Sequence, residues 1–312
     1  MKQLLFQNGD VFPVIGLGTY LSKKNEVYNA VIEAIRAGYR HIDCAYIYGN
    51  EAEIGRALQF TLNEGLVKRE DLFITSKLWN SDHAPKRVEL AIRKSLSNLQ
   101  LDYLDLYLMH WPIAFKTGRE QAKNATDLLT LDEMPIELTW KAMEAVRQAG
   151  LAKHIGVSNF NILKLQKLID VAEIKPEVNQ IELHPYFQQN ELVQFCQKNA
   201  ILVTAFSPLG SRHLINGDKS ITNNEVVIRI AQKHACLPTQ ILLAWGIKRE
   251  TVVIPKSVNP IRIIENLASV NIKLDEQDMI ELSKIDQNNR LAKGLYCVLP
   301  GGYYTLETIW DK

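Results

Sequence analysis

Residues 72–109 read LFITSKLWNSDHAPKRVELAIRKSLSNLQLDYLDLYLM, in which two short apolar runs flank a longer amphipathic stretch. Leu72 to Lys77 and Tyr103 to Met109 have the length and apolar content of buried strands. Between them, Lys86 to Leu99 places apolar residues three and four positions apart, which predicts a helix with one buried face. A strand, a helix and a second strand in this order predict two parallel strands joined by a helical crossover.

The same alternation runs along the whole chain. Strands are expected at residues 15–18, 41–43, 72–77, 103–109, 152–157, 178–181, 202–205 and 252–254. Helices are expected at residues 25–37, 51–64, 86–99, 136–149, 162–170, 191–198, 239–248 and 261–267. Because the strand–helix repeats continue without a linker-like stretch, they predict an α/β fold: a closed, parallel (β/α)8 TIM barrel that forms a single domain over residues 1–312.

Several additions to the regular barrel are also expected. Residues 5–12 predict an N-terminal hairpin, with Asn8-Gly9 in a type I′ turn. Two extra helices are expected near residues 223–234 and 275–285. The segments 111–135 and 289–312 are too long and irregular for simple connections, so we expect them to form a pocket rim on the C-terminal face of the barrel.

Composition and charge exclude several classes of protein. The 312 residues are 46% hydrophobic and carry a formal net charge of +1, so a nucleic-acid partner is not expected. No apolar run approaches the roughly 20 residues of a membrane span, and the N-terminus does not resemble a signal peptide, so we expect a cytoplasmic protein with no membrane partner. The 4 cysteines are far apart and include no Cys-x-x-Cys pair, which predicts neither a disulfide framework nor a thiolate zinc site.

Four polar side chains lie at or just after the ends of expected strands: Asp43, Tyr48, Lys77 and His110. In a parallel barrel these ends meet at one mouth, so a carboxylate, a phenol, an amine and an imidazole are expected to form an acid–base relay. A phenol has a pKa near 10, and a cation about 4 Å away is expected to lower that pKa by about 3 units before desolvation opposes it. Lys77 is the expected cation, and Asp43 is expected to hold it.

The ends of the later strands carry groups that suit a nucleotide cofactor. Ser158-Asn159 and Gln180 offer amide and hydroxyl hydrogen-bonding groups, Phe206 offers an aromatic face, and Lys256 offers a positive charge. Together these suit a nicotinamide carboxamide, the nicotinamide ring and a nucleotide phosphate.

Five segments carry a resemblance to a known family. They are Gly16-Leu17-Gly18-Thr19, the segment 38–51 (GYRHIDCAYIYGNE), Leu108-Met109-His110-Trp111-Pro112, the segment 155–160 (IGVSNF), and Ile254-Pro255-Lys256-Ser257. In this order and spacing the chain resembles an aldo-keto reductase. The resemblance implies that Asp43, Tyr48, Lys77 and His110 are a catalytic tetrad. It also implies a nicotinamide nucleotide bound without a Rossmann fold, and Gly16-x-Gly18 followed by Leu21 agrees, because the dinucleotide fingerprint is absent.

The resemblance assigns further roles residue by residue. It implies that the tetrad reduces an aldehyde, aldose or ketone by hydride transfer, with Tyr48 as the proton donor, and that NADPH is preferred to NADH. The implied cofactor-binding residues are Gly18, Thr19, Tyr20, Asp43, Ser158, Asn159, Gln180, Phe206, Ser207, Leu209, Ser211, Lys256, Ser257, Val258, Asn259, Arg262, Glu265 and Asn266. The implied substrate-binding residues are Tyr48, Trp79, His110, Trp111, Phe115 and Cys297, and no metal is implied.

Departures from the family pattern and two other classes of function remain open at this stage. Phe206 stands where many relatives have tyrosine, and Leu21 stands where some have a lysine that latches a loop over the cofactor, so closure of the loop 207–220 through Asp218 is an open question. A regulatory subunit that has lost catalysis would have a broken tetrad. A metal-dependent hydrolase would need a His/Asp cluster, and His184 lacks companion ligands.

Overall fold

A computed structural model gives the fold and describes residues 3–23, 25–211 and 220–311. At its centre is an eight-stranded sheet in which strands that follow each other around the barrel are paired in parallel. These strands are β3 (Leu17–Gly18), β4 (His41–Asp43), β5 (Phe73–Leu78), β6 (Leu104–Met109), β9 (Ala152–Ser158), β10 (Val178–Glu182), β11 (Leu202–Phe206) and β12 (Thr251–Val253).

The sheet closes on itself where β3 meets β12. The backbone amide of Gly16 donates to the carbonyl of Val253 over 2.9 Å, and the amide of Gly18 donates to the carbonyl of Pro255 over 3.1 Å. The backbones approach so closely that a Cβ atom on Gly18 would lie 2.7 Å from the carbonyl oxygen of Ile254. This seam requires glycine at position 18, and it confirms the predicted closed barrel.

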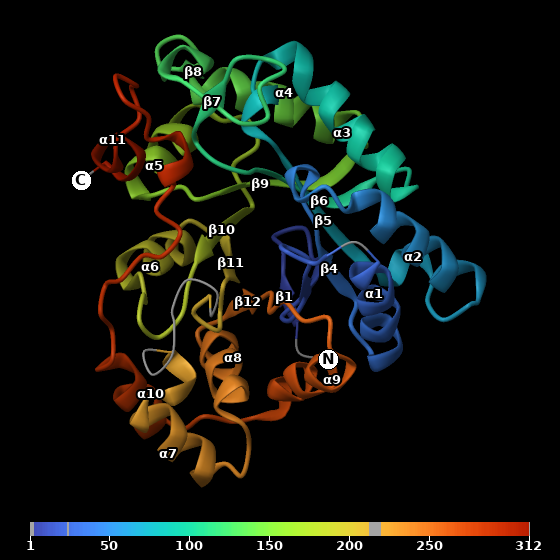
Figure 1. Cartoon of the computed structure of the whole chain (residues 1–312), viewed down its shortest axis with the longest axis vertical. Coiled ribbons are helices and arrows are strands. Elements are labelled where there is room, and N and C mark those ends of the chain that lie inside the picture. Colours follow the sequence, from blue (N-terminus) through green and yellow to red (C-terminus); the bar gives the residue numbers. More distant parts are fainter. Residues whose placement is uncertain (1–2, 24, 212–219, 312) are drawn as a thin grey trace.

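Helices cover the outside of the barrel, as Figure 1 shows. They are α1 (Glu26–Ala37), α2 (Glu51–Asn63), α3 (Pro85–Leu99), α4 (Ile136–Gln148), α5 (Ile162–Val171), α6 (Asn190–Lys198), α8 (Pro238–Lys248) and α9 (Pro260–Ala268). Each helix turns an apolar face to the strands; in α3 this face includes Val88, Ile92 and Leu99, all fully buried. The two extra helices predicted from the sequence are α7 (Glu225–Lys233) and α10 (Glu276–Ser283).

The N-terminal hairpin covers the end of the barrel at which the strands begin. It consists of β1 (Gln3–Leu5) and β2 (Val11–Pro13), and its Phe6 and Phe12 rings stack with Phe73 of β5. The predicted type I′ turn is wrong, because that turn needs a positive φ at both central residues and only Gly9 has one, at 88°. The amide of Gly9 instead donates to the carbonyl of Phe6, which gives a longer loop with glycine at the left-handed position.

The opposite end of the barrel carries the two long segments predicted as a rim. The first contains a small antiparallel pair, β7 (Ala114–Phe115) and β8 (Leu128–Leu129), which the sequence pattern did not predict. The second, residues 289–311, we call the C-terminal tail; it contains the short 3-10 helix η8 (Leu295–Cys297) and α11 (Leu306–Trp310). The far end of the tail is fixed to α5, because the Lys164 ammonium donates to the carbonyls of Thr308 and Ile309.

Two further predictions from the sequence concern membrane-spanning helices and closure of the loop 207–220. No helix in the described ranges is long and apolar enough to cross a membrane. Residues 212–219 are outside these ranges, so the open question of loop closure through Asp218 falls outside the described residues.

Candidate active site

The main cavity of the described part of the chain lies at the ends of the barrel strands and has a volume of about 1080 Å³. Each of the eight strands contributes a lining residue from within the strand or from the position just beyond it: Gly18, Asp43, Trp79, His110, Ser158, Gln180, Phe206 and Ile254. Tyr48 and the tail residues 291–296 complete the lining. The cavity therefore lies where a parallel barrel gathers its functional side chains.

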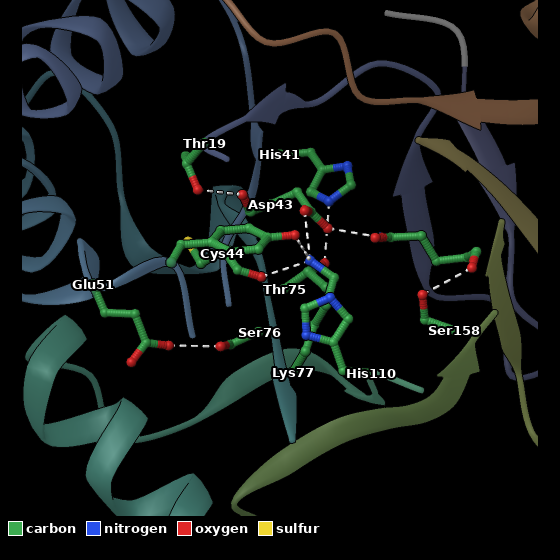
Figure 2. A network of polar contacts seen from close by, with 12 residues as sticks. Thr19, His41, Asp43, Cys44, Glu51, Thr75, Ser76, Lys77, His110 and Ser158 are labelled. Atoms are coloured by element: carbon green, nitrogen blue, oxygen red, sulfur yellow. Dashed lines mark hydrogen bonds and ion pairs between the residues drawn. The ribbon is translucent and has the colours of Figure 1, made fainter. Parts of the chain in front are cut away.

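Lys77 lies behind two cavity-lining side chains, Asp43 and Tyr48, and is the centre of a buried hydrogen-bond network (Figure 2). Its ammonium lies 2.6 Å from Oδ1 of Asp43, 2.7 Å from the carbonyl oxygen of Cys44 and 3.5 Å from the hydroxyl of Tyr48. Burial acts to lower the pKa of Lys77, but the negative charge of Asp43 and the neighbouring Tyr48 outweigh burial and raise that pKa. Lys77 is therefore a cation although its side chain has no exposed surface.

The Asp43 carboxylate is fixed on its other side. Gln180 donates from Nε2 to Oδ2 of Asp43 over 2.8 Å, and Thr19 donates from its hydroxyl to the Asp43 backbone carbonyl over 2.8 Å. Asp43 of β4 is thus bonded to Lys77 of β5 on one side and to Gln180 of β10 on the other. Because each partner has a second contact, the position of the lysine charge is well defined.

Tyr48 extends from the short 3-10 helix η1 (Tyr46–Tyr48) that follows β4. Gly49 ends this helix with a φ of 70°, a left-handed conformation that suits glycine. Burial raises the pKa of Tyr48 to about 12, and the positive charge of Lys77 only partly opposes this rise. The net change in the pKa is therefore opposite to the lowering expected from Lys77, because desolvation of the phenolate outweighs the attraction of the lysine.

His110 faces Tyr48 across the cavity. The two rings are edge to face with centroids 5.8 Å apart, and the Trp79 ring lies 5.2 Å from His110 on another side. Burial lowers the pKa of His110 well below its usual value, and the charge of Lys77 adds to this effect. The imidazole is therefore neutral at pH 7 and can donate a hydrogen bond into the cavity.

Ser158, Asn159 and Gln180 form the wall opposite the seam. Asn159 donates from Nδ2 to the backbone carbonyl of His110 over 3.0 Å, and Ser158 donates from its hydroxyl to the backbone carbonyl of Gln180 over 2.9 Å. The Oδ1 atom of Asn159 is buried without a hydrogen-bond partner. A buried acceptor beside the cavity fits a ligand amide N–H, such as that of a nicotinamide carboxamide.

The remaining cofactor residues predicted from the sequence divide into two groups. Tyr20, Phe206, Ser207, Leu209, Ser211 and Lys256 line the cavity together with Gly18 and Thr19. Ser257, Val258, Asn259, Arg262, Glu265 and Asn266 do not line it; they form the loop before α9 and the first turns of that helix.

Lys256 and Arg262 place two positive charges at the start of α9. Burial lowers the pKa of Lys256, and Arg262 and Lys23 lower it further while Glu26 opposes them. Within the described residues, neither Lys256 nor Arg262 makes an ion pair. Asn259 caps the helix by accepting from the Arg262 amide over 3.1 Å, so its Oδ1 is already used. Two unpaired cations at a helix N-terminus fit an anion.

An aromatic group, which we call the aromatic wall, closes the other end of the cavity. It consists of Trp79, Trp111, Phe115 and Tyr296; Tyr296 stacks on Trp79 with centroids 5.8 Å apart and meets Trp111 edge to face at 5.6 Å. Phe115 contacts these rings from behind and does not line the cavity. Cys297 is also buried behind the wall, where burial raises its thiol pKa to about 12.

Other lining residues were not identified from the sequence. Ile47, Gln121, Ala122 and the stretch 291–294 all line the cavity. The loop that carries Gln121 is fixed by its neighbour Glu120, whose backbone carbonyl accepts from Nε1 of Trp79 over 2.7 Å and whose carboxylate accepts from the Tyr46 hydroxyl over 2.8 Å. These loops have no periodic pattern, so the sequence carries no signal for which of their residues face inward.

Comparison with known proteins shows the family to which the chain belongs. The Aldo/keto reductase family model matches residues 14–287, which includes every strand of the barrel. The chain belongs to the aldo/keto reductase family. As a member, it is an oxidoreductase that reduces carbonyl groups of small molecules.

Individual members of the aldo/keto reductase family match over nearly the whole chain. An aldo/keto reductase of Synechocystis is 44% identical, over 100% of this chain and 97% of its own length. The aldo-keto reductase family 1 member A1 of Mus musculus is 46% identical, over 93% of this chain and 90% of its own. The structure of the aldose reductase from Schistosoma japonicum superposes with a TM-score of 0.89 at 41% identity, covering 97% of each chain.

Within the described residues, no group of three or more His, Cys, Asp or Glu side chains is placed to hold a metal ion. His184 donates from its Nε2 atom to Glu182 over 2.9 Å.

Proposed function

We propose that this aldo/keto reductase reduces aldehydes to alcohols with NADPH, and that Tyr48 supplies the proton. The observation that carries the proposal is the position of the Tyr48 hydroxyl, 3.5 Å from the Lys77 ammonium and inside the cavity, beside a neutral His110. The N–H of a neutral imidazole is a weaker acid than a phenol, so the phenol is the stronger candidate for the acid.

A reduced nicotinamide, when bound between Phe206 and the polar side chains of Ser158, Asn159 and Gln180, would supply the hydride for the carbonyl carbon of the substrate. Negative charge develops on the carbonyl oxygen, and Tyr48 gives its hydroxyl proton to that oxygen as the alcohol forms. Lys77 then stabilises the phenolate left on Tyr48, because its ammonium is the nearest positive charge. His110 donates a hydrogen bond to the same oxygen and so orients the carbonyl.

Asp43 is proposed to position Lys77 and does not exchange a proton with the substrate. Its carboxylate is occupied by Lys77 on one oxygen and by Gln180 on the other. These contacts hold the lysine charge where the phenolate forms, so loss of Asp43 is expected to act on the rate through Lys77.

The choice of NADPH is proposed from the two groups of polar residues at the cavity edge. Ser158, Asn159 and Gln180 would hold the carboxamide, and the Phe206 ring would cover the nicotinamide. Lys256 and Arg262 would bind the 2′-phosphate, the group that distinguishes NADPH from NADH. Glu265 and Asn266 would hold the adenine.

The substrate class is proposed from the aromatic wall. Trp79 presents only its ring to the cavity, because its indole N–H is already bonded to the Glu120 carbonyl. Since Trp111, Ile47 and Leu295 are also apolar lining residues, aromatic or medium-chain aldehydes are expected to have a lower KM than small polar aldoses. We also propose that residues 1–312 act as one catalytic domain and that the enzyme works in the cytoplasm.

The direct test follows the loss of reduced-nicotinamide absorbance with a panel of aromatic aldehydes, short aldehydes, aldoses and ketones. The proposal expects turnover of aromatic aldehydes with NADPH. A chain that binds NADPH but turns over no carbonyl compound would instead be a binding or regulatory subunit that has kept the fold.

A further inference from the structure

We propose that Glu182, which does not line the cavity, sets the selectivity for large aldehydes by anchoring the start of the C-terminal tail. This inference rests on the proposed aldehyde-reducing function. It assigns to Glu182 the role of a positioning residue, which acts on the substrate only through the tail.

Glu182 is the last residue of β10 and is fully buried. Its carboxylate accepts from Nε2 of His184 over 2.9 Å, from the backbone amide of Leu291 over 2.9 and 3.1 Å, and from the backbone amide of Ala292 over 2.8 Å. All these partners are donors, which suits a carboxylate because it can only accept. The positive charge of Arg290 lies close enough to interact with Glu182.

The two amides that Glu182 binds belong to residues of the cavity wall. Leu291 and Ala292 line the cavity and begin the stretch that leads to Tyr296 in the aromatic wall. The stretch is supported from outside, because Trp310 donates from Nε1 to the carbonyl of Lys293 over 3.0 Å. Displacement of Leu291 and Ala292 therefore moves the apolar end of the cavity.

The tail has no strand pairing that could replace this anchor in the described residues. The residues just before the anchor are also held, because the Asn289 amide donates to the carbonyl of Tyr186 over 3.2 Å and Arg290 donates to Oε1 of Gln189 over 3.1 Å. The far end is held by the contact of Lys164 with α11, which lies beyond the aromatic wall along the chain. Among these contacts, those of Glu182 are the ones made to the backbone amides of the cavity-lining Leu291 and Ala292. The tetrad has its own contacts within the barrel, so loss of this anchor is expected to spare the chemical step.

Glu182→Gln is the first test, because it keeps the size of the side chain and removes two of the acceptor positions. The expected result is a rise of about tenfold in KM for a substituted benzaldehyde, with kcat for propanal and the Kd for NADPH within about twofold of wild type. Such a split between KM and kcat is not expected from general destabilisation.

The matched control is Glu177→Gln at the other end of the same strand. Glu177 also accepts from a histidine, His154, over 2.9 Å, and from a backbone amide, that of Ile155, over 3.2 Å. It lies at the base of the barrel, far along β10 from the cavity. Equal KM changes in the two variants would overturn the proposal, since both lose comparable hydrogen bonds.

A second measurement needs no activity: the rate of tryptic cleavage after Lys293 in the folded chain. Glu182→Gln should be cleaved faster than wild type and faster than Glu177→Gln, because the anchored stretch is released. Ala292→Pro removes one donor and leaves the carboxylate intact, so it should show the same faster cleavage. This second variant keeps the test decisive if Glu182→Gln does not fold.

The outcomes separate the two proposals. If wild type reduces no aldehyde, the proposed function fails, whereas faster cleavage of both variants would still establish the anchor. If cleavage rises in both variants but the KM ranking of the aldehydes is unchanged, the selectivity role is overturned. If neither variant is cleaved faster than wild type, Glu182 does not anchor the tail.

Discussion

The Lys77 ammonium lies 2.6 Å from the Asp43 carboxylate in an ion pair that is almost completely buried. Removing one partner of such a pair leaves an uncompensated charge in the interior, which commonly costs about 3–5 kcal/mol of stability. Substitutions in this pair therefore change both folding and chemistry, while Tyr48 offers a way to change the chemistry alone.

Tyr48→Phe should reduce kcat for aldehyde reduction by at least about 100-fold, because only the proton donor is removed. The melting temperature and the Kd for NADPH should stay close to wild type. Tyr46→Phe is the matched control, since Tyr46 lies in the same short helix and bonds to Glu120 instead of reaching the cavity. Steady-state kinetics of both variants measure kcat. A kcat of Tyr48→Phe within tenfold of wild type would contradict the role of Tyr48 as proton donor.

Lys77→Met should lower the free energy of unfolding by about 3–5 kcal/mol, because Asp43 loses its cation. The double variant Asp43→Asn/Lys77→Met should recover part of this loss and remain inactive. Urea denaturation measures the first effect and an aldehyde assay the second. A double variant no more stable than Lys77→Met would show that the buried charge of Asp43 is not the cause.

Arg262→Ala should reduce kcat/KM with NADPH by about tenfold and leave kcat/KM with NADH nearly unchanged, because it removes one partly solvated cation from the 2′-phosphate. Lys273→Ala, an exposed cation on the segment that follows α9, is the control. Kinetics with both coenzymes test the prediction. Equal losses with NADPH and NADH would show that Arg262 does not distinguish them.

Stability should fall as the pH falls below about 6.5. Burial lowers the pKa of His41 and of His83 to about 3 from an ordinary value of 6.5, so between these limits the unfolded chain binds protons that the folded chain does not. Each histidine should contribute a slope of about 1.4 kcal/mol per pH unit. The unfolding free energy should depend less steeply on pH in His41→Gln than in wild type, and less steeply again in the double variant His41→Gln/His83→Gln. Unchanged slopes in these variants would contradict the prediction.

The strand ends were predictable because the barrel itself makes them meet. The sequence pattern predicted β4 at residues 41–43, where the structure has it, and the other barrel strands began or ended within two residues of their predicted bounds. This was sufficient to bring Asp43, Tyr48 and His110 to one cavity, with Lys77 in contact with Asp43 and Tyr48 behind its lining. The Asn-Gly turn was predicted wrongly, since turn type depends on the pairing register of β1 and β2, which the dipeptide does not determine.

Solvation and loop geometry could not be predicted from the sequence. The effect of Lys77 on Tyr48 follows from Coulomb's law, but the opposing desolvation depends on rings such as Tyr20, whose centroid lies 5.0 Å from that of Tyr48. Similarly, Tyr296 faces the cavity and the adjacent Cys297 does not, because the short helix η8 turns them in different directions. Such local turns have no periodicity from which an orientation could be inferred.

The seam between β3 and β12 also has a consequence for how the chain folds. Ile15 pairs with Val253 and Gly18 with Lys256, so closure joins residues from opposite ends of the sequence. Contacts between such distant residues cost the most loop-closure entropy and form late. Since Gly18 and Lys256 both line the cavity, a partly folded chain with an open seam has an incomplete cavity wall and no intact place to hold a coenzyme.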